Sequence, residues 1–146
     1  MVILVTGGAG YIGSQLIRDL RNEFPDETIR ILDNMMREKY VSLWGLESKY
    51  EFIEADVRNR ETLQNAFVDV DTVFDLVGIT NAPISFERKE RTIDVNVNGV
   101  KNILEFALKN DANYVYSSTA SVYGNTDGKV VNEDVECHPQ SPYGES

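Results

Sequence analysis

The sequence predicts an α/β fold with a doubly wound parallel sheet, formed as one domain over residues 1–146. Short apolar runs recur along the chain, amphipathic helical patterns separate them, and a glycine-rich turn joins the first run to the first helix. Strands that are connected by helices run parallel, because each crossover returns the chain to the same edge of the sheet.

The expected strands and helices follow in order. The apolar runs that indicate strands are residues 2–5, 29–32, 52–53, 72–74 and 114–116. A helix that Pro25 helps to end lies between the first two runs, with a predicted buried stripe of Ile12, Leu16, Leu20 and Phe24. A second predicted stripe precedes the last strand and consists of Val97, Val100, Leu104 and Leu108. After Gly124 the chain is polar and rich in Asn, Gly and Pro, which predicts a long loop.

Composition excludes several classes of function. The formal charge of -10, from 24 acidic and 14 basic side chains, repels nucleic acid and an anionic membrane, so we expect neither as a partner. Cys137 is the only cysteine and His138 the only histidine, so we expect no disulfide and no metal site, with His138 in an exposed loop. No apolar run reaches about 18 residues and no secretory leader is recognisable, which predicts a cytoplasmic protein.

The turn at residues 6–13 contains two overlapping glycine patterns. Gly8, Gly10 and Gly13 form one, and Gly7, Gly10 and Gly13 form the other. A sharp strand-to-helix turn requires positive φ, a pyrophosphate must approach bare backbone, and the helix must lie close to the sheet. The start of a helix also offers free N–H groups and partial positive charge to an anion. The turn therefore predicts a dinucleotide-binding Rossmann fold.

Asp33 ends the second expected strand. A carboxylate there can accept both hydroxyls of the adenosine ribose and would repel a 2′-phosphate, which favours NAD over NADP. The structural alternative is an ordinary turn residue at a strand end.

Further segments carry a family resemblance over the whole chain. Residues 33–34 are similar to a family's ribose-binding pair, 56–58 to its adenine-contacting segment, 76–78 to the stretch whose backbone passes the cofactor ribose, and 96–99 to its N-V-x-G. The family that the sequence thereby resembles is the extended short-chain dehydrogenases, the NAD-dependent epimerases and dehydratases. Among these, the sequence most resembles the UDP-glucose 4-epimerases and related nucleotide-sugar epimerases. The resemblance implies that NAD contacts Gly7, Gly10, Tyr11, Ile12, Gly13, Asp33, Asn34, Asp56, Val57, Leu76, Val77, Gly78, Asn96 and Ser117.

The same resemblance implies two catalytic residues. Residues 116–124 are similar to the family's S-S-[ST]-x-x-V-Y-G, and residues 141–146 to the start of its S-P-Y-x-x-S-K. Thr119 and Tyr143 take the catalytic positions. A phenol is a poor base unless nearby positive charge favours its anion, which the lysine of the motif and the nicotinamide ring would supply. Tyr143 would then remove a proton from a sugar hydroxyl while hydride passes to NAD, with the Thr119 hydroxyl holding the sugar oxygen. Taken singly, both residues have structural alternatives, as a strand former and a loop aromatic.

The sequence also departs from the family's pattern. The motif lysine would be residue 147, so we expect this chain to be a fragment without its substrate domain and with little or no turnover. Asp75 stands where many relatives have histidine, and we expect it to accept hydrogen bonds at the strand end rather than to tune the cofactor. Ala120 and Ser121 are small, as in the epimerases, whereas the 4,6-dehydratases carry an acidic pair there.

The sequence is compatible with three functions. The first is an NAD-dependent epimerase acting at C4 of a nucleotide-linked sugar such as a UDP-hexose, and the second is a related dehydratase or dehydrogenase. The third is a non-catalytic NAD-binding module. The resemblance also implies a homodimer for the full-length protein, with the helix before the last strand as one of its pairing helices.

Overall fold

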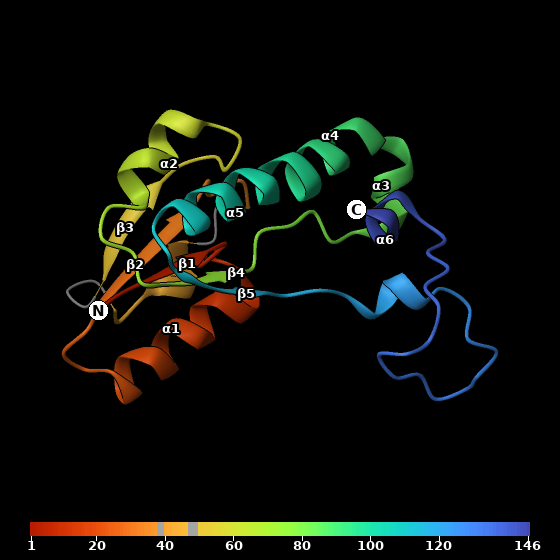
Figure 1. Ribbon diagram of the computed structural model, residues 1–146, viewed down its shortest axis with the longest axis horizontal. Coiled ribbons are helices and arrows are strands. Elements are labelled where there is room, and N and C mark those ends of the chain that lie inside the picture. Colours follow the sequence, from red (N-terminus) through yellow and green to blue (C-terminus); the bar gives the residue numbers. More distant parts are fainter. Residues whose placement is uncertain (38–39, 47–49) are drawn as a thin grey trace.

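The computed structural model describes residues 1–37, 40–46 and 50–146. Its centre is a five-stranded sheet in which every neighbouring pair runs parallel, in the order β3-β2-β1-β4-β5 (Figure 1). The strands are β1 (Val2–Thr6), β2 (Thr28–Asp33), β3 (Glu51–Glu54), β4 (Thr72–Asp75) and β5 (Asn113–Tyr116). Each of the five apolar runs lies within one of these strands, which confirms the predicted strands.

Helices cover both faces of the sheet. The α-helices are α1 (Tyr11–Glu23), α2 (Arg60–Ala66), α3 (Ala82–Glu87), α4 (Lys89–Ile93), α5 (Val100–Lys109) and α6 (Pro142–Glu145). Short 3-10 turns occupy η1 (Tyr40–Leu43) and η3 (Ala120–Tyr123). Helix α1 lies on one face of the sheet, and α2 and α5 lie on the other (Figure 1). Two apolar cores result, one on each face, so the doubly wound fold class is confirmed.

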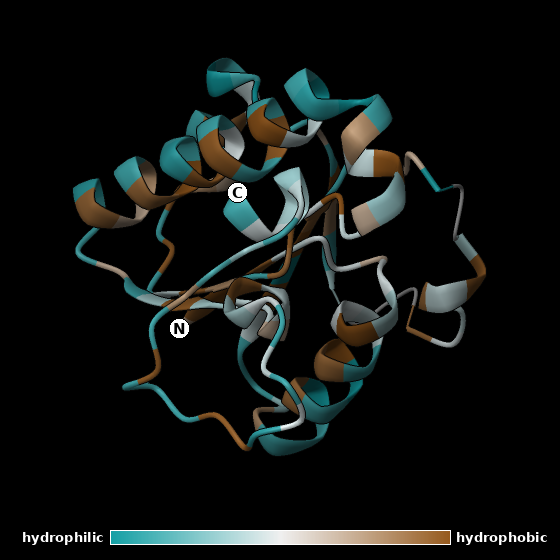
Figure 2. Cartoon of the chain, turned by 90° about the vertical axis from the view of Figure 1, so that its right-hand side faces the viewer, coloured by the Kyte–Doolittle hydropathy of each residue, from teal (hydrophilic) through white to brown (hydrophobic). Residues whose placement is uncertain are grey.

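The two helical stripes were predicted correctly only in part: of the first, Leu20 is buried and Leu16 packs against the core. In α1 the buried residues are Gly13, Ile17 and Leu20, whereas Ile12 and Phe24 are exposed. A strict repeat of four residues drifts by about 40° per step around a helix with 3.6 residues per turn, so its ends leave the buried face. Spacings that alternate between three and four stay on one face. Figure 2 shows the resulting stripes of hydrophobic and hydrophilic residues along the helices.

The second stripe was misplaced because of the same drift of a four-residue repeat, and also because a π-helical turn precedes α5. The buried residues of α5 are Ile103, Phe106 and Ala107, whereas Leu104 and Leu108 are exposed. The six residues of η2 (Asp94–Gly99), which precede α5 without a break, form a π-helical turn. Such a turn holds an extra residue and shifts the phase of the helical pattern, and π-turns are frequent at functional sites.

The strand order places a topological switch at the centre of the sheet. From β1 the chain proceeds outward to β2 and β3, and it then crosses back to β4 on the other side of β1. The loops that leave the carboxyl ends of β1 and β4 therefore diverge and open a crevice, which is where open α/β sheets bind ligands.

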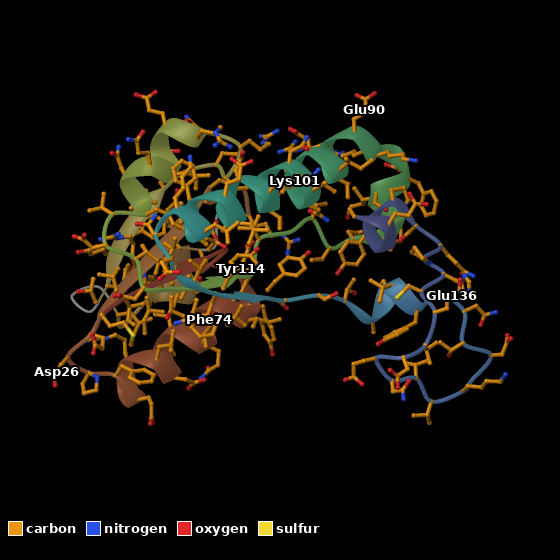
Figure 3. The ribbon with its side chains drawn as sticks, viewed as in Figure 1. Asp26, Phe74, Glu90, Lys101, Tyr114 and Glu136 are labelled. Carbon is orange, nitrogen blue, oxygen red and sulfur yellow. The ribbon has the colours of Figure 1, made fainter. Side chains whose placement is uncertain are left out.

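The chain between η3 and α6 forms the predicted long loop. It contains no helix or strand, and it projects from the body of the molecule, with Glu136 on its surface (Figure 3). His138 is exposed there, as expected, and its Nε2 lies 3.6 Å from a carboxylate oxygen of Glu136. Among the helices described, none is both long and apolar enough to cross a membrane.

Candidate functional site

A cavity of about 550 Å³ opens at the carboxyl edge of the sheet. Loops after β1, β2, β3, β4 and β5 all contribute to its wall, together with η2 and α6. All the residues predicted for cofactor binding and catalysis line it: Gly7, Gly10, Tyr11, Ile12, Gly13, Asp33, Asn34, Asp56, Val57, Leu76, Val77, Gly78, Asn96, Ser117, Thr119 and Tyr143. Segments that are more than 130 residues apart along the chain are thus brought to one site.

The glycine turn is shaped by close backbone contacts. Gly7 has a φ of +68°, and a Cβ atom there would lie 2.8 Å from the carbonyl oxygen of Leu76. A Cβ atom on Gly13 would lie 2.6 Å from the carbonyl oxygen of Gly7, so α1 can approach the turn only with glycine at this position. Any larger residue would have to displace backbone rather than a flexible side chain.

The start of α1 is suited to an anion. No side chain caps its first turn, and the N-cap residue is Gly10. Tyr11 and Ile12, which follow, are strongly exposed and line the cavity. Uncapped N–H groups and the positive end of the helix dipole therefore face the cavity, in a chain whose formal charge is -10.

Asp33 is held firmly at the end of β2. Its Oδ2 accepts the N–H of Ala9 at 3.0 Å, and its Oδ1 accepts the N–H of Met35 at 2.9 Å. Each oxygen keeps a further lone pair that can accept another hydrogen bond. The carboxylate is therefore oriented beside the glycine turn, which is where a bound ribose requires it.

Asp56 is neutralised by a neighbouring cation. Arg58 donates to both of its carboxylate oxygens, at 2.9 and 2.8 Å, and also donates to Asp94 of η2 at 2.9 Å. Chiefly because of the hydrogen bond from Arg58, the pKa of Asp56 falls from 3.8 to about 2. Asn34 adds a longer contact of 3.5 Å to the same carboxylate. This network joins the β3 loop to the turn that carries Asn96.

Asp75 lies below the cavity and is fully buried. Its carboxylate accepts hydrogen bonds from the Thr6 hydroxyl at 2.7 Å, the Tyr114 hydroxyl at 2.6 Å and the Val77 N–H at 3.2 Å. Burial raises the pKa of Asp75, and it also raises the pKa of Tyr114, with the Asp75 charge as a further cause. These contacts confirm that Asp75 accepts hydrogen bonds at the strand end. Asp75 thereby fixes the backbone that leads into the Leu76–Gly78 segment of the cavity wall.

Asn96 joins two walls of the cavity. Its Oδ1 accepts the N–H of Ile79 at 2.8 Å, and its Nδ2 donates to the carbonyl of Ile79 at 3.2 Å and to Oγ of Ser146 at 2.9 Å. The π-helical turn thus presents this side chain to the β4 loop and to the segment that carries Tyr143. In this structure the side chain of Asn96 is directed to the backbone of Ile79 and the hydroxyl of Ser146, although the residue borders the cavity.

Thr119 and Tyr143 come from separate segments, and both line the cavity. Thr119 caps η3 by accepting the N–H of Ser121 at 3.1 Å, which leaves its hydroxyl hydrogen free to donate. Tyr143 lies in the first turn of α6, which Ser141 caps. Burial raises the pKa of Tyr116, which also borders the cavity, with smaller contributions from Asp75 and Tyr143.

Several residues near the cavity were missed by the sequence analysis. Arg37 and Arg91 place two exposed cations on its wall, and Arg91 donates to the sulfur of Met36 at 3.1 Å. Ser85 lies behind the wall, fully buried, and accepts the N–H of Tyr143. These residues belong to no motif, and their partners are distant in sequence, so the chain alone carries no signal for them.

Comparisons with known proteins agree with this geometry. The pattern of the NAD dependent epimerase/dehydratase family matches residues 3–146. A bifunctional UDP-glucose 4-epimerase and UDP-xylose 4-epimerase of Pisum sativum is 33% identical over 151 residues, which cover 97% of this chain and 43% of that protein. The chain therefore spans less than half the length of this relative.

Solved structures give the same result. The UDP-glucose 4-epimerase of Thermus thermophilus in complex with NAD superimposes with a TM-score of 0.90 at 29% identity, over 99% of this chain and 47% of that one. The dTDP-glucose 4,6-dehydratase DesIV of Streptomyces venezuelae, with NAD and TYD bound, superimposes with a TM-score of 0.89 at 27% identity. The match covers 99% of this chain and 48% of that one. With the matched family pattern spanning nearly all of its residues, the chain belongs to the NAD-dependent epimerase/dehydratase family.

Proposed function

We propose that the cavity binds NAD and that a protein containing this chain is a nucleotide-sugar 4-epimerase of the UDP-glucose 4-epimerase type. One observation carries the proposal: the uncapped start of α1, Asp33 with its oriented carboxylate, Thr119 and Tyr143 all line one cavity. A dinucleotide is long enough to extend from an anion site to a reaction site within such a cavity.

The residues present fit NAD better than NADP. Gly7, Gly10 and Gly13 line the cavity and carry no side chains, and the start of α1 has no side-chain cap, so a pyrophosphate can approach the backbone there. Asp33 keeps lone pairs for two ribose hydroxyls, and its negative charge opposes a 2′-phosphate. Arg37 and Arg91 also border the cavity, and their positive charge would favour a phosphate there. Asp33, however, is fixed beside the turn by two backbone amides, so its negative charge opposes a 2′-phosphate directly at the ribose position.

The side chains supply proton transfer and orientation. NAD, when bound, supplies a hydride acceptor at the sugar carbon. Tyr143 removes the proton from the sugar hydroxyl at that carbon and later returns it. The free hydroxyl hydrogen of Thr119 donates to the same sugar oxygen and keeps it in line with Tyr143. Epimerisation requires the sugar to turn over between the two transfers and to receive the hydride on its other face.

Substrate class is supported by the relatives and by two small residues. The pea relative carries the names of two UDP-sugar epimerases, and the Thermus structure that of a UDP-glucose 4-epimerase. Ala120 and Ser121 follow Thr119 and bring no carboxylate to this part of the chain, whereas elimination of water from a sugar requires an added acid and base.

Cofactor binding can be tested on this chain by calorimetry. We expect NAD to bind with a stoichiometry of one, NADP to bind at least about tenfold more weakly, and Asp33→Ala to remove most of that preference. Asp26→Ala is the matched control, because Asp26 is exposed in the turn between α1 and β2, at the end of the sheet opposite the cavity (Figure 3). Equal affinity for NAD and NADP in the unaltered chain would contradict the proposal.

The reaction is tested on a longer protein, which contains this chain and also the region that its relatives have beyond the matched residues. NMR of UDP-galactose incubated with this protein is expected to show UDP-glucose without net change in NADH absorbance, and Tyr143→Phe is expected to abolish the conversion. Accumulation of a 4-keto sugar would identify a dehydratase or dehydrogenase instead. NAD binding without conversion of any UDP- or dTDP-hexose would favour a non-catalytic binding module.

We also propose that this longer protein forms a homodimer through α5. Leu104 and Leu108 are exposed on that helix, which leaves an apolar strip free for a second copy. Sedimentation of the longer protein should give a dimer, and Leu108→Glu should shift it toward monomer. A monomeric unaltered protein would contradict this.

A further inference from the structure

Ser85 is a buried polar residue behind the cavity wall. It lies in α3 with no exposed surface, and its hydroxyl donates to the carbonyl oxygen of Ala82 at 2.6 Å. The same hydroxyl oxygen accepts the N–H of Tyr143 at 3.1 Å. Both functions of the hydroxyl are therefore used, one within its own helix and one toward a residue 58 positions later.

The second hydrogen bond completes the first turn of α6. The first N–H groups of any helix have no partner within the helix. In α6, Pro142 has no N–H and the Ser141 side chain caps Gly144 at 3.1 Å, so the N–H of Tyr143 remains for Ser85. The bond therefore acts on the backbone of Tyr143, a residue that lines the cavity.

The carbonyl group of Tyr143 also takes part in a hydrogen bond. It accepts a hydrogen bond from Oγ of Ser146 at 2.9 Å, and that oxygen in turn accepts Nδ2 of Asn96 at 2.9 Å. Both polar backbone groups of Tyr143 are thus connected to the layer formed by α3 and η2. Of the two connections, the one through Ser85 is direct, and Ser85 itself is fully buried.

We infer that Ser85 is a positioning residue for Tyr143: its buried hydroxyl fixes the backbone of Tyr143 against α3 and so sets where the phenol lies in the cavity. The inference rests on the proposed function, in which Tyr143 transfers the proton. Proton transfer requires hydrogen-bond distance, and displacement of a reacting group by about 1 Å can cost on the order of 100-fold in rate.

The test uses the longer protein with Ser85→Ala, and Ser85→Cys as a nearly isosteric second variant with a weak acceptor. We expect kcat to fall roughly 10- to 100-fold in Ser85→Ala, while KM for UDP-galactose and Kd for NAD stay within about twofold. Thr92→Val is the matched control, because Thr92 is equally buried and its hydroxyl donates to the Arg88 carbonyl one turn earlier. Its kcat is expected to stay within about twofold.

Amide hydrogen exchange in the 146-residue chain gives an independent measurement. The Tyr143 amide is expected to exchange at least about tenfold faster in Ser85→Ala, and to be unchanged in Thr92→Val. If Ser85→Ala does not fold, Ser85→Cys is read against the same expectations.

The outcomes separate this inference from the proposed function. Wild-type kcat in Ser85→Ala and Ser85→Cys, with activity lost in Tyr143→Phe, overturns the role of Ser85 alone. Loss of NAD affinity in parallel with kcat also overturns it, because that result indicates a general structural role. Full activity in Tyr143→Phe overturns the proposed function, and the role of Ser85 with it.

Discussion

The Tyr114 hydroxyl donates a hydrogen bond of 2.6 Å to the carboxylate of Asp75, which is buried between β1 and β5 (Figure 3 labels Tyr114). Thr6 and the Val77 N–H complete a set of three donors around this carboxylate. Three donors compensate for part of the cost of removing a charge from water, and they connect the ends of β1 and β4 to the neighbouring strand β5. The strand ends that support the cavity are therefore joined by one ionisable group.

The titration of Asp75 should make stability depend on pH. Burial raises the pKa of Asp75 in the folded chain above the ordinary value of 3.8, so the folded state binds more protons than the unfolded state between these two values. The contribution of Asp75 to the free energy of unfolding is therefore largest at low pH and declines as the pH rises through this window. Urea unfolding between about pH 4 and about pH 7 measures it.

Asp75→Asn is the variant that isolates this effect. It removes the titration, and its amide oxygen still accepts while Tyr114 can rotate its hydroxyl to accept from the amide nitrogen. The difference in unfolding free energy between the original chain and Asp75→Asn should change with pH across the window. A difference that is constant with pH would show that Asp75 does not titrate there.

Asp56 is expected to titrate in the opposite direction. Its pKa of about 2 arises mainly from the hydrogen bond from Arg58, so Arg58→Gln should return the midpoint toward 3.8. The stabilising contribution of this pair is present above the ordinary value and is lost as the pH falls through about 2. Carbon-13 NMR of the side-chain carboxyls measures the midpoint directly.

Arg60→Gln is the control for this titration. Arg60 pairs with Glu105 at 2.7 Å between α2 and α5, and it is not among the groups that shift the pKa of Asp56. We expect the midpoint of Asp56 to be unaffected by this change. The explanation through Arg58 fails if Arg58→Gln and Arg60→Gln give the same value as the original chain.

The strands could be predicted because they are buried on both faces, so their residues are apolar without a strict periodic pattern. Residues such as Leu4 and Val73 are buried by helices on the sheet faces, so a short apolar run is enough to indicate them. Helical faces were less predictable, since Leu104 and Leu108 continue an apolar pattern while lying outside the core. The π-helical turn before them has no sequence signal that would have corrected the phase.

The residues of the site also differ in how far the sequence could predict them. The glycine turn follows from backbone geometry, because positive φ and close packing leave few alternatives to Gly7 and Gly13. Thr119 and Tyr143 were identified through a family resemblance, and the structure brings them to one cavity. Ser85 was missed, since a serine inside an ordinary helix becomes informative only when its partner, 58 residues later, is known.

Gly13→Ala tests how closely α1 must approach the turn. The added Cβ would lie 2.6 Å from the Gly7 carbonyl oxygen and 2.7 Å from the Gly8 Cα, both of which are backbone atoms. We expect α1 to move outward, which should lower the free energy of unfolding by about 1–3 kcal/mol and weaken NAD binding at least about tenfold. Ser14→Ala, the next residue of the same helix, is the control and should change neither quantity appreciably. Wild-type stability and affinity in Gly13→Ala would mean that the turn tolerates a displaced helix.

Trypsin should cut the loop between η3 and α6, at Lys129, before it cuts α5. A protease needs several residues of extended, accessible chain, and such segments occur where few buried contacts hold the backbone. Lys129 follows Gly128 in a stretch without helix or strand, and the next residue, Val130, is 99% exposed. Lys101 and Lys109, by contrast, lie within α5, where cleavage requires local unfolding. Mass spectrometry of a brief digest is expected to show a cut after Lys129 before any cut in α5, and Lys129→Gln should delay it. Early cleavage after Lys109 would instead place the least stable part of the chain at the end of α5.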